Sequence, residues 1–353
     1  MPVLASRTAS VDGAWLGLSP RRESPIVERL GGKAKEPCEM ALDLHGTRFL
    51  LYARRLGVCF SRSAMIGRQR LIIGAGGLKR NLAEFGFLPD EDTIRRIFRD
   101  NDGYAEGFLR YLGANEVHSF DNSGYEGATH LHDLNQEIPD CYKERYSMVL
   151  DGGSLEHVFN FPVALRNCME MVEVGGHYLA ITPVNNLMGH GFYQFSPELY
   201  SSVFSQANGY QVVSMIAYEE MPLARWFSVV NPHQAGARVT LTNRIPTNLL
   251  VIAKRMERTV VFESVPQQIH YFRKWDERGE DICLSQSSNP PRAIYARLIP
   301  PSVKRFIRRR LEQLLGYNEL GFDPRFFQPM KPSDDEEARG KAPFCSDTSK
   351  SGP

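Results

Sequence analysis

Three aspartates, Asp121, Asp133 and Asp151, stand at or just after the ends of short apolar segments in the middle of the chain. Such segments are typical of buried strands, and ligands of open α/β sheets bind outside the carboxyl ends of the strands, where the strand order reverses. The three acids therefore predict a site for a nucleoside-like cofactor. The alternative is that they are loop-capping acids, which are common in turns.

A histidine follows the third of these acids. His157 comes directly after Glu156, in the polar turn beyond Asp151. An imidazole changes its charge near neutral pH, so His157 suits the removal of a proton from a hydroxyl or an amine. The alternative is a polar pair at the start of a helix.

A second group of polar and aromatic side chains follows the next apolar segment and includes His190, Tyr193 and Gln194. Loops at that edge carry substrate specificity in sheets of this type. We expect these residues, together with Glu156, to line a substrate. The alternative is an aromatic cluster that packs the loop.

Two further histidines, His130 and His132, alternate along one strand and so face the same side of it. With Asp133 they suggest a metal ion, but two histidines without a third spaced ligand are a weak pattern. The sequence therefore predicts no metal site.

The elements that position these residues form a parallel βαβ unit within residues 146–213. Its order is a buried strand, a polar turn with Gly152, a helix, a Gly-Gly turn and a second buried strand. Ser196 followed by Pro197 begins another helix. The alternation of strands and helices predicts an α/β fold, a Rossmann-like doubly wound, mostly parallel sheet of seven strands with an N-terminal helical lead and a C-terminal helical extension.

The ends of the chain differ in composition from its centre. Residues 1–36 and 331–353 lack a sustained apolar period, which predicts disordered segments. Between them we expect the α/β domain over 37–258 and an extension over 259–330. Within the extension, 301–315 is a basic amphipathic helix that suits contact with an anionic membrane surface or packing on the domain.

The overall composition narrows the function further. The 353 residues are 42% hydrophobic and 24% charged, as in soluble globular proteins. The net charge of +1 gives no general attraction to nucleic acid. Six scattered cysteines form no C-x-x-C pair, so we expect neither a disulfide framework nor a zinc site, and a cytoplasmic location fits.

The order and spacing of several segments resemble the class I S-adenosylmethionine-dependent methyltransferases, in particular the small-molecule branch of the type 11 and type 12 domains. The match runs from about Ala64 to Lys254. Its segments are Y-S-M-V-L-D-G-G-S-L-E-H-V-F-N, V-E-V-G-G-H-Y-L-A-I-T-P, and F-S-P-E-L-Y followed by N-G-Y-Q-V-V. They resemble the family's fourth strand and turn, its fifth strand, and its last helix with the sixth strand.

The resemblance implies S-adenosyl-L-methionine as cofactor and methyl transfer to an oxygen or nitrogen of a small molecule, such as a saccharide or a secondary metabolite. It implies that Asp121 accepts hydrogen bonds from both ribose hydroxyls, since a carboxylate can bridge a diol. Asp133 would contact the adenine amino group, and Leu134 the adenine ring. The implied cofactor-binding set is Gly67, Arg68, Asp121, Asn122, Asp133, Leu134, Asp151 and Gly152, and the implied catalytic residues are His157 and His190.

The turn after the first strand departs from the family's pattern. In the family this strand runs into a G-x-G-x-G turn, whereas here it runs into I-G-R-Q with the single glycine Gly67. Either Gly67 and the insertion that follows rebuild the cofactor floor, or cofactor binding is weakened or lost. The second outcome gives the alternative function, a catalytically inactive binding or scaffold protein. An α/β enzyme that uses a nucleotide sugar or a dinucleotide is a third possibility.

Overall fold

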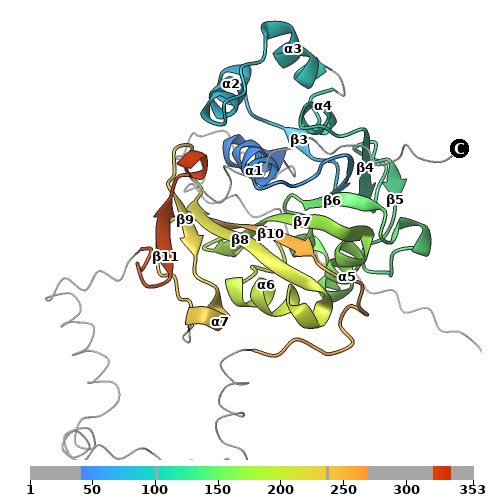
Figure 1. Cartoon of the computed structure of the whole chain (residues 1–353), viewed down its shortest axis with the longest axis vertical. Helices are drawn as coiled ribbons and strands as arrows, with labels where there is room; N and C mark the ends of the chain where they lie inside the picture. The colour runs from blue at the N-terminus through green and yellow to red at the C-terminus, as the bar shows by residue number, and fades with distance from the viewer. Residues whose placement is uncertain (1–40, 100–101, 236–237, 269–320, 335–353) are drawn as a thin grey trace, which may run out of the picture. The chain divides into compact units, whose positions relative to one another are not determined.

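The computed structural model describes residues 41–99, 102–235, 238–268 and 321–334. The described part is built on a nine-stranded sheet with helices packed against both faces (Figure 1). The predicted segment 1–36, the basic helix 301–315 and residues 335–353 of the predicted tail lie outside the described residues.

Five strands run parallel to one another in one half of the sheet. In spatial order they are β5 (His130–Leu131), β4 (Glu116–Asp121), β2 (Arg62–Ile66), β6 (Tyr146–Asp151) and β7 (Val172–Asn185). Counted along the chain among these five, the order is 3-2-1-4-5, which is the arrangement of the doubly wound Rossmann-like class. The predicted fold class is therefore confirmed.

The other half of the sheet is antiparallel and corrects the predicted strand count. Beyond β7 it adds, in spatial order, β10 (Thr247–Arg255), β8 (Tyr210–Glu219), β9 (Trp226–Val229) and β11 (Phe327–Met330). The described sheet thus has nine strands where the sequence predicts seven. The two missed strands, β9 and β11, have four residues each, which is too short for apolar alternation to stand out.

The helices divide between the two faces of the sheet. On one side, α1 (Leu44–Arg55) and α4 (Glu106–Tyr111) lie next to the sheet, and α2 (Ala75–Glu84) and α3 (Glu91–Arg99) pack on these two helices (Figure 1). The other face is covered by α5 (Phe161–Met171) and α6 (Pro197–Val203), with α7 (Pro232–Ala235) beside α6. Each face of the sheet has its own hydrophobic core. Because side chains alternate along a strand, Met148 and Leu150 of β6 lie in the core between the sheet and α1 and α4, and Val149 lies in the core between the sheet and α5 and α6.

Local signals fix where the helices begin. The Asp43 carboxylate accepts a hydrogen bond from the Gly46 N–H at 2.8 Å and so caps α1. Ser196, the predicted helix start, accepts one from the Leu199 N–H at 3.3 Å, and Pro197 occupies the first turn of α6.

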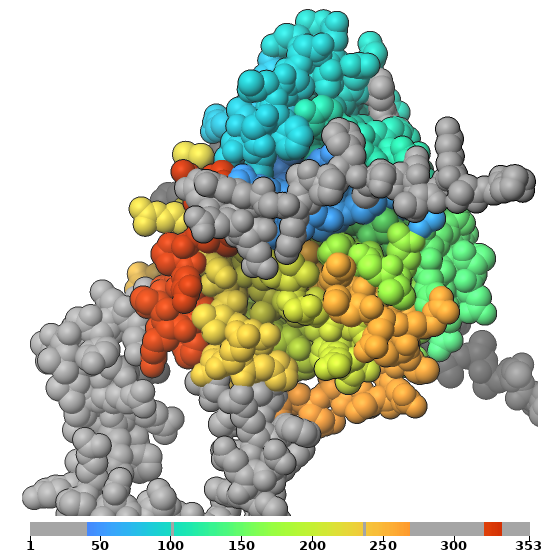
Figure 2. All heavy atoms as spheres, in the orientation of Figure 1, coloured from blue at the N-terminus to red at the C-terminus, as the bar shows by residue number. Residues whose placement is uncertain are grey.

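The insertion predicted after Gly67 folds into a short strand and two helices outside the main sheet. It contains β3 (Arg70–Leu71), which pairs with β1 (Ala41–Leu42) outside the main sheet, followed by α2 and α3. In the space-filling view, α2 and α3 gather at one end of the described part, and β11 lies at the surface beside β9 (Figure 2).

Cys59 is disulfide-bonded, which corrects the expectation that the cysteines stay unpaired. The spacing of cysteines along a sequence does not reveal their connectivity. Cys141 and Cys168 are free. Among the helices of the described residues, none has the length and apolar character that a membrane span requires.

Candidate active site

The reversal of strand order lies between β2 and β6. After β2 the chain proceeds outward to β4 and β5, and it then returns to form β6 and β7 on the other side of β2. Open α/β sheets bind ligands at this switch point, outside the carboxyl ends of the strands. Here those ends carry Gly67, after β2, and Asp151 with Gly152, at the end of β6.

Hydrogen bonds and an ion pair to neighbouring segments fix the turn after β2. Gly67 has a left-handed backbone (φ 69°), which glycine adopts without strain, and its N–H donates to the Phe120 carbonyl at 2.8 Å. The Arg68 guanidinium bonds the Glu106 carboxylate at 2.7 Å and lies 4.0 Å from the centre of the Tyr104 ring. Arg68, predicted to bind the cofactor, is thus already engaged by two side chains.

Gln69 is a residue of this site that the sequence did not identify. Its side chain is buried and donates from Nε2 to the Ile66 carbonyl at 3.0 Å. Its Oε1 atom has no hydrogen-bond partner among the described residues. A Cβ atom at Gly152 would lie 2.4 Å from this Oε1, so the Gln69 amide lies directly on the backbone of Gly152. No sequence pattern predicts that a glutamine in this turn packs its amide against Gly152.

The acids of β4 and β5 lie in different surroundings. Asp121 ends β4, is partly exposed, and accepts the Ser123 N–H at 2.9 Å through Oδ1, and Asn122 beside it is exposed. Asp133 accepts the backbone and side-chain N–H groups of Asn135 at 2.9 and 2.8 Å, and these bonds lower the pKa of its carboxyl. Leu134 is buried in the hydrophobic core.

Asp151 is fully buried and holds the turn after β6. Its Oδ1 accepts the N–H groups of Ser154 and Leu155 at 2.8 and 3.3 Å, and Tyr178 donates its hydroxyl to Oδ2 at 3.2 Å. Burial, followed by the nearby Glu156 carboxylate, raises the pKa of Asp151 to about 7.

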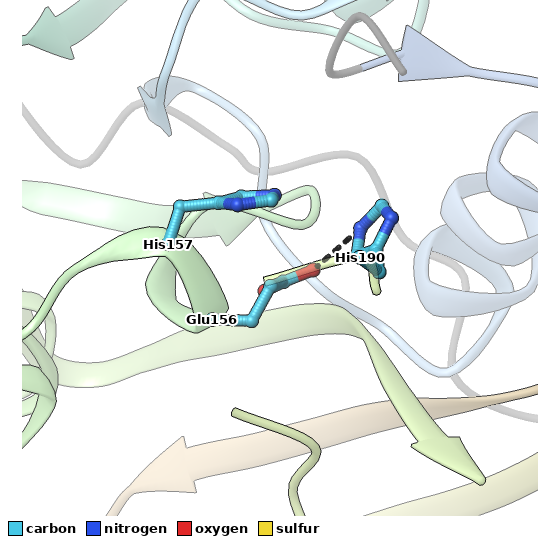
Figure 3. A group of neighbouring side chains, drawn as sticks. All are labelled: Glu156, His157 and His190. Atoms are coloured by element: carbon cyan, nitrogen blue, oxygen red, sulfur yellow. Dashed lines mark ion pairs between the residues drawn. The ribbon is translucent and has the colours of Figure 1, made fainter. Parts of the chain in front are cut away.

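Glu156, His157 and His190 come together at the carboxyl ends of β6 and β7. Glu156 and His157 end the short 3-10 helix η3 (Leu155–His157), and His190 comes from the loop after β7. The Glu156 side chain is 1% exposed, and its Oε1 lies 3.4 Å from His190 Nε2 (Figure 3). The two imidazole rings lie 5.0 Å apart between centroids. Burial lowers the pKa of His157, and His190 adds to that effect while Glu156 opposes it.

Backbone contacts fix the loop that carries His190. The Phe192 and Tyr193 N–H groups donate to the Glu156 carbonyl at 2.8 and 3.2 Å. A Cβ at Gly191 would lie 2.8 Å from that carbonyl oxygen, so only glycine allows this close approach.

Two predicted substrate-lining residues bond within the same loops. The Tyr193 hydroxyl donates to the Phe159 carbonyl at 2.7 Å, and Gln194 accepts the Leu187 N–H at 2.8 Å. Their polar atoms therefore contribute to holding the loops in place.

The structure thus brings together the predicted residues Glu156, His157 and His190, next to the predicted Asp151 and Gly152. Gly153, between Gly152 and Glu156, would place a Cβ 3.2 Å from Glu156 Oε1. Asp133 and Leu134 lie in the turn after β5, where Asp133 bonds Asn135 and Leu134 packs in the core.

Comparison with known proteins gives matches only among solved structures, since no protein-family model and no curated protein matches the chain. A Listeria monocytogenes protein described as an S-adenosylmethionine-dependent methyltransferase is 12% identical, with a TM-score of 0.34 over 60% of this chain and 100% of that one. A Bacillus halodurans C-125 protein described as a methyltransferase is 12% identical, with a TM-score of 0.30 over 59% and 99%.

The 1,6-didemethyltoxoflavin-N1-methyltransferase of Burkholderia thailandensis, solved with 1,6-didemethyltoxoflavin and S-adenosylhomocysteine, is 14% identical, with a TM-score of 0.32 over 61% of this chain and 78% of that one. With identities of 12–14% and TM-scores of 0.30–0.34, these similarities alone do not assign a fold family or a function to the chain. The strand order gives the chain a doubly wound, Rossmann-like fold.

Proposed function

We propose that the protein is an S-adenosylmethionine-dependent methyltransferase that acts on an oxygen or nitrogen atom of a small molecule. The observation that carries the proposal is the place of Asp121, a partly exposed carboxylate at the end of β4, one strand from the switch point. A carboxylate at this position suits the two ribose hydroxyls of a nucleoside.

Further groups at the switch point fit the cofactor. The unpartnered Oε1 of Gln69 is a buried acceptor beside Gly152, and an ammonium group such as that of the methionine part would satisfy it. Arg68 and Asp151 support the site indirectly, because they shape the two turns through bonds to the protein.

When bound, S-adenosylmethionine would supply an electrophilic methyl group. The C–S bonding electrons would stay on sulfur, which becomes a neutral thioether, an acceptor lone pair would form the new bond to carbon, and the acceptor proton would pass to a base or to water. The chain's own residues align the acceptor and receive that proton. The lowered pKa of His157 keeps its imidazole neutral at pH 7, as a proton acceptor must be. His190 is the second candidate base.

The exposed rings of Phe159 and Phe192 suit an acceptor with an apolar part. They meet edge to face at 5.9 Å, and each belongs to one of the two loops that carry the histidines. Ligand sites commonly combine such apolar walls with a few polar groups that orient the ligand. The acceptor would enter over these rings and direct its oxygen or nitrogen toward the histidines.

The Gln69 side chain also favours the second candidate function, a methyltransferase-like binding protein without catalysis. Its amide covers the backbone of Gly152 at the switch point. If that amide blocks the cofactor, the substitution Gln69→Ala will strengthen cofactor binding. If the amide contacts the cofactor, the same substitution will weaken binding.

The test is a calorimetric titration of the full chain with S-adenosylhomocysteine. The substitution Asp121→Ala should weaken binding by roughly 2–3 kcal/mol, or on the order of 100-fold, because it removes a charged acceptor. The matched control is Asp140→Ala, an exposed acid that precedes β6 at its opposite end and pairs with Lys143. Failure of the unaltered protein to bind would overturn the proposal in favour of the second candidate.

A further inference from the structure

We propose that Glu156, His157 and His190 form a binding site for a divalent transition-metal cation. The three residues each offer one ligand atom, and these atoms all lie within 4.8 Å of one another. Figure 3 shows the two imidazole rings on either side of the Glu156 carboxylate. One carboxylate and two imidazoles are the protein ligands of many open zinc and iron sites.

The buried Glu156 carboxylate is the second, independent observation. Its side chain is 1% exposed, and both of its oxygens lack a hydrogen-bond partner among the described residues. A buried carboxylate is costly unless it is paired, hydrogen-bonded or bound to a metal. The His190 ring at 3.4 Å lies beyond the usual 2.7–3.2 Å of an N–H···O hydrogen bond. A cation between them would satisfy the carboxylate.

The spacing of the Glu156 and His190 atoms fits a shared ion. Zinc binds imidazole nitrogen and carboxylate oxygen at about 2.0–2.2 Å with tetrahedral geometry, which places two ligands about 3.4 Å apart. The observed separation of Glu156 Oε1 and His190 Nε2 is 3.4 Å. His157 completes the set from the adjacent position of η3.

The surrounding backbone holds these ligands in place. The loop with His190 bonds the Glu156 carbonyl through two N–H groups, and Gly191 brings it within contact of both Glu156 and His157. A preformed arrangement of this kind lowers the conformational cost of binding an ion. Imidazole and carboxylate together favour zinc, iron, cobalt or nickel over magnesium and calcium, which prefer oxygen ligands throughout.

Three protein ligands leave at least one coordination position open. Under the proposed methyltransferase function, on which this step alone rests, that position would receive an oxygen of the acceptor. The ion would then lower the pKa of that oxygen and orient it, and the two histidines would act as its ligands in place of bases, so that the proton passes to water. The acceptor class that follows is a hydroxyl or enol compound able to bind a metal.

The test is calorimetric titration of the chelator-treated full chain with Zn²⁺ and, separately, Co²⁺, without S-adenosylmethionine. We expect one ion per chain, with a change in the visible spectrum of Co²⁺, and no comparable binding of Mg²⁺. Glu156→Gln and His190→Ala should each weaken Zn²⁺ binding by at least ~100-fold, since loss of even an outer-shell partner typically costs 10–100-fold.

The matched control is His132→Ala, which removes a partly exposed histidine outside the three-residue group. Its Zn²⁺ affinity should equal that of the unaltered protein. The site is rejected if the unaltered protein binds no Zn²⁺, or if the Glu156 and His190 variants, shown to be folded by their melting curves, bind it unchanged. Because no cofactor is present, either result stands apart from the test of methyltransferase function.

Discussion

Two histidine clusters, one on the strands of the sheet and one in the loops at its carboxyl edge, differ in whether their polar atoms are hydrogen-bonded. In the first, on β4, β5 and β6, the His118 ring bonds the Tyr146 hydroxyl at 2.9 Å, and the His130 ring lies 3.3 Å from His118 and 3.2 Å from the Tyr142 hydroxyl. In the second, the buried Glu156 carboxylate has no hydrogen bond among the described residues.

The comparison shows that satisfied hydrogen bonds, more than residue type, separate a structural cluster from a candidate site. The sequence pattern pointed to His130 as a weak metal ligand, yet its ring takes part in a network of side chains. From the sequence, Glu156 is predicted only to line a substrate. Its burial and its lack of hydrogen bonds are properties of the folded chain and cannot be read from residue order. Four predictions, from the largest expected effect to the smallest, test this contrast.

The largest effect should come from the first cluster. Tyr146→Ala removes a fully buried ring whose hydroxyl bonds His118. We expect a loss of about 3–5 kcal/mol in the free energy of unfolding, as for other large core rings. Urea denaturation measures it. A loss below about 1 kcal/mol would mean that the cluster does not stabilise the fold.

The second prediction concerns pH near the other cluster. The folded-state pKa of Asp151 is raised to about 7, so between about pH 4 and pH 7 the folded chain binds more protons than the unfolded chain. This residue's contribution to stability should therefore fall as pH rises, by roughly 2–3 kcal/mol between pH 5 and pH 7. Asp151→Asn should abolish that part of the slope in denaturation measured across this range.

For the first cluster, the free energy of unfolding should change with pH in the opposite direction and less steeply. Burial lowers the pKa values of His118 and His130, so the unfolded chain binds more protons than the folded chain once pH falls toward and below 6.5. The stability contributed by these rings is present at higher pH and is lost on acidification. His130→Phe should make the melting temperature less sensitive to pH between 7 and 5, and an unchanged profile would exclude this role for His130.

The smallest effect should follow Glu156→Gln in the absence of metal. Removing a buried charge that lacks hydrogen bonds costs little, so the free energy of unfolding should stay within about 1 kcal/mol of the original value or rise. Tyr146→Phe, which removes the hydroxyl that bonds the His118 ring, should instead lower it by about 1 kcal/mol. Equal losses in both variants would remove the distinction between the clusters.

Much of the fold was predictable because its signals are local. The apolar run that ends at Asp151 matches a wholly buried strand, and the Ser196 cap begins α6 as predicted. The sequence analysis missed the antiparallel strands β9 and β11 because four-residue strands carry little apolar pattern, and β11 also pairs with a strand far away in sequence. The site was predictable in part. The strand-end pattern places Asp121, Glu156, His157 and His190 at the carboxyl edge of the sheet, whereas the burial of Leu134 and the position of Gln69 depend on packing between segments.

The pairing of β11 with β9 has a consequence for how the protein behaves in concentrated solution. An open sheet edge can join another chain and begin aggregation. Here one edge strand, β5, is only two residues long, and the other, β11, contains Pro329, which has no N–H to offer. A chain cut before residue 321 would lose β11 and expose the edge of β9, whereas a chain cut after Met330 would keep this protection. The cut before residue 321 should therefore favour self-association.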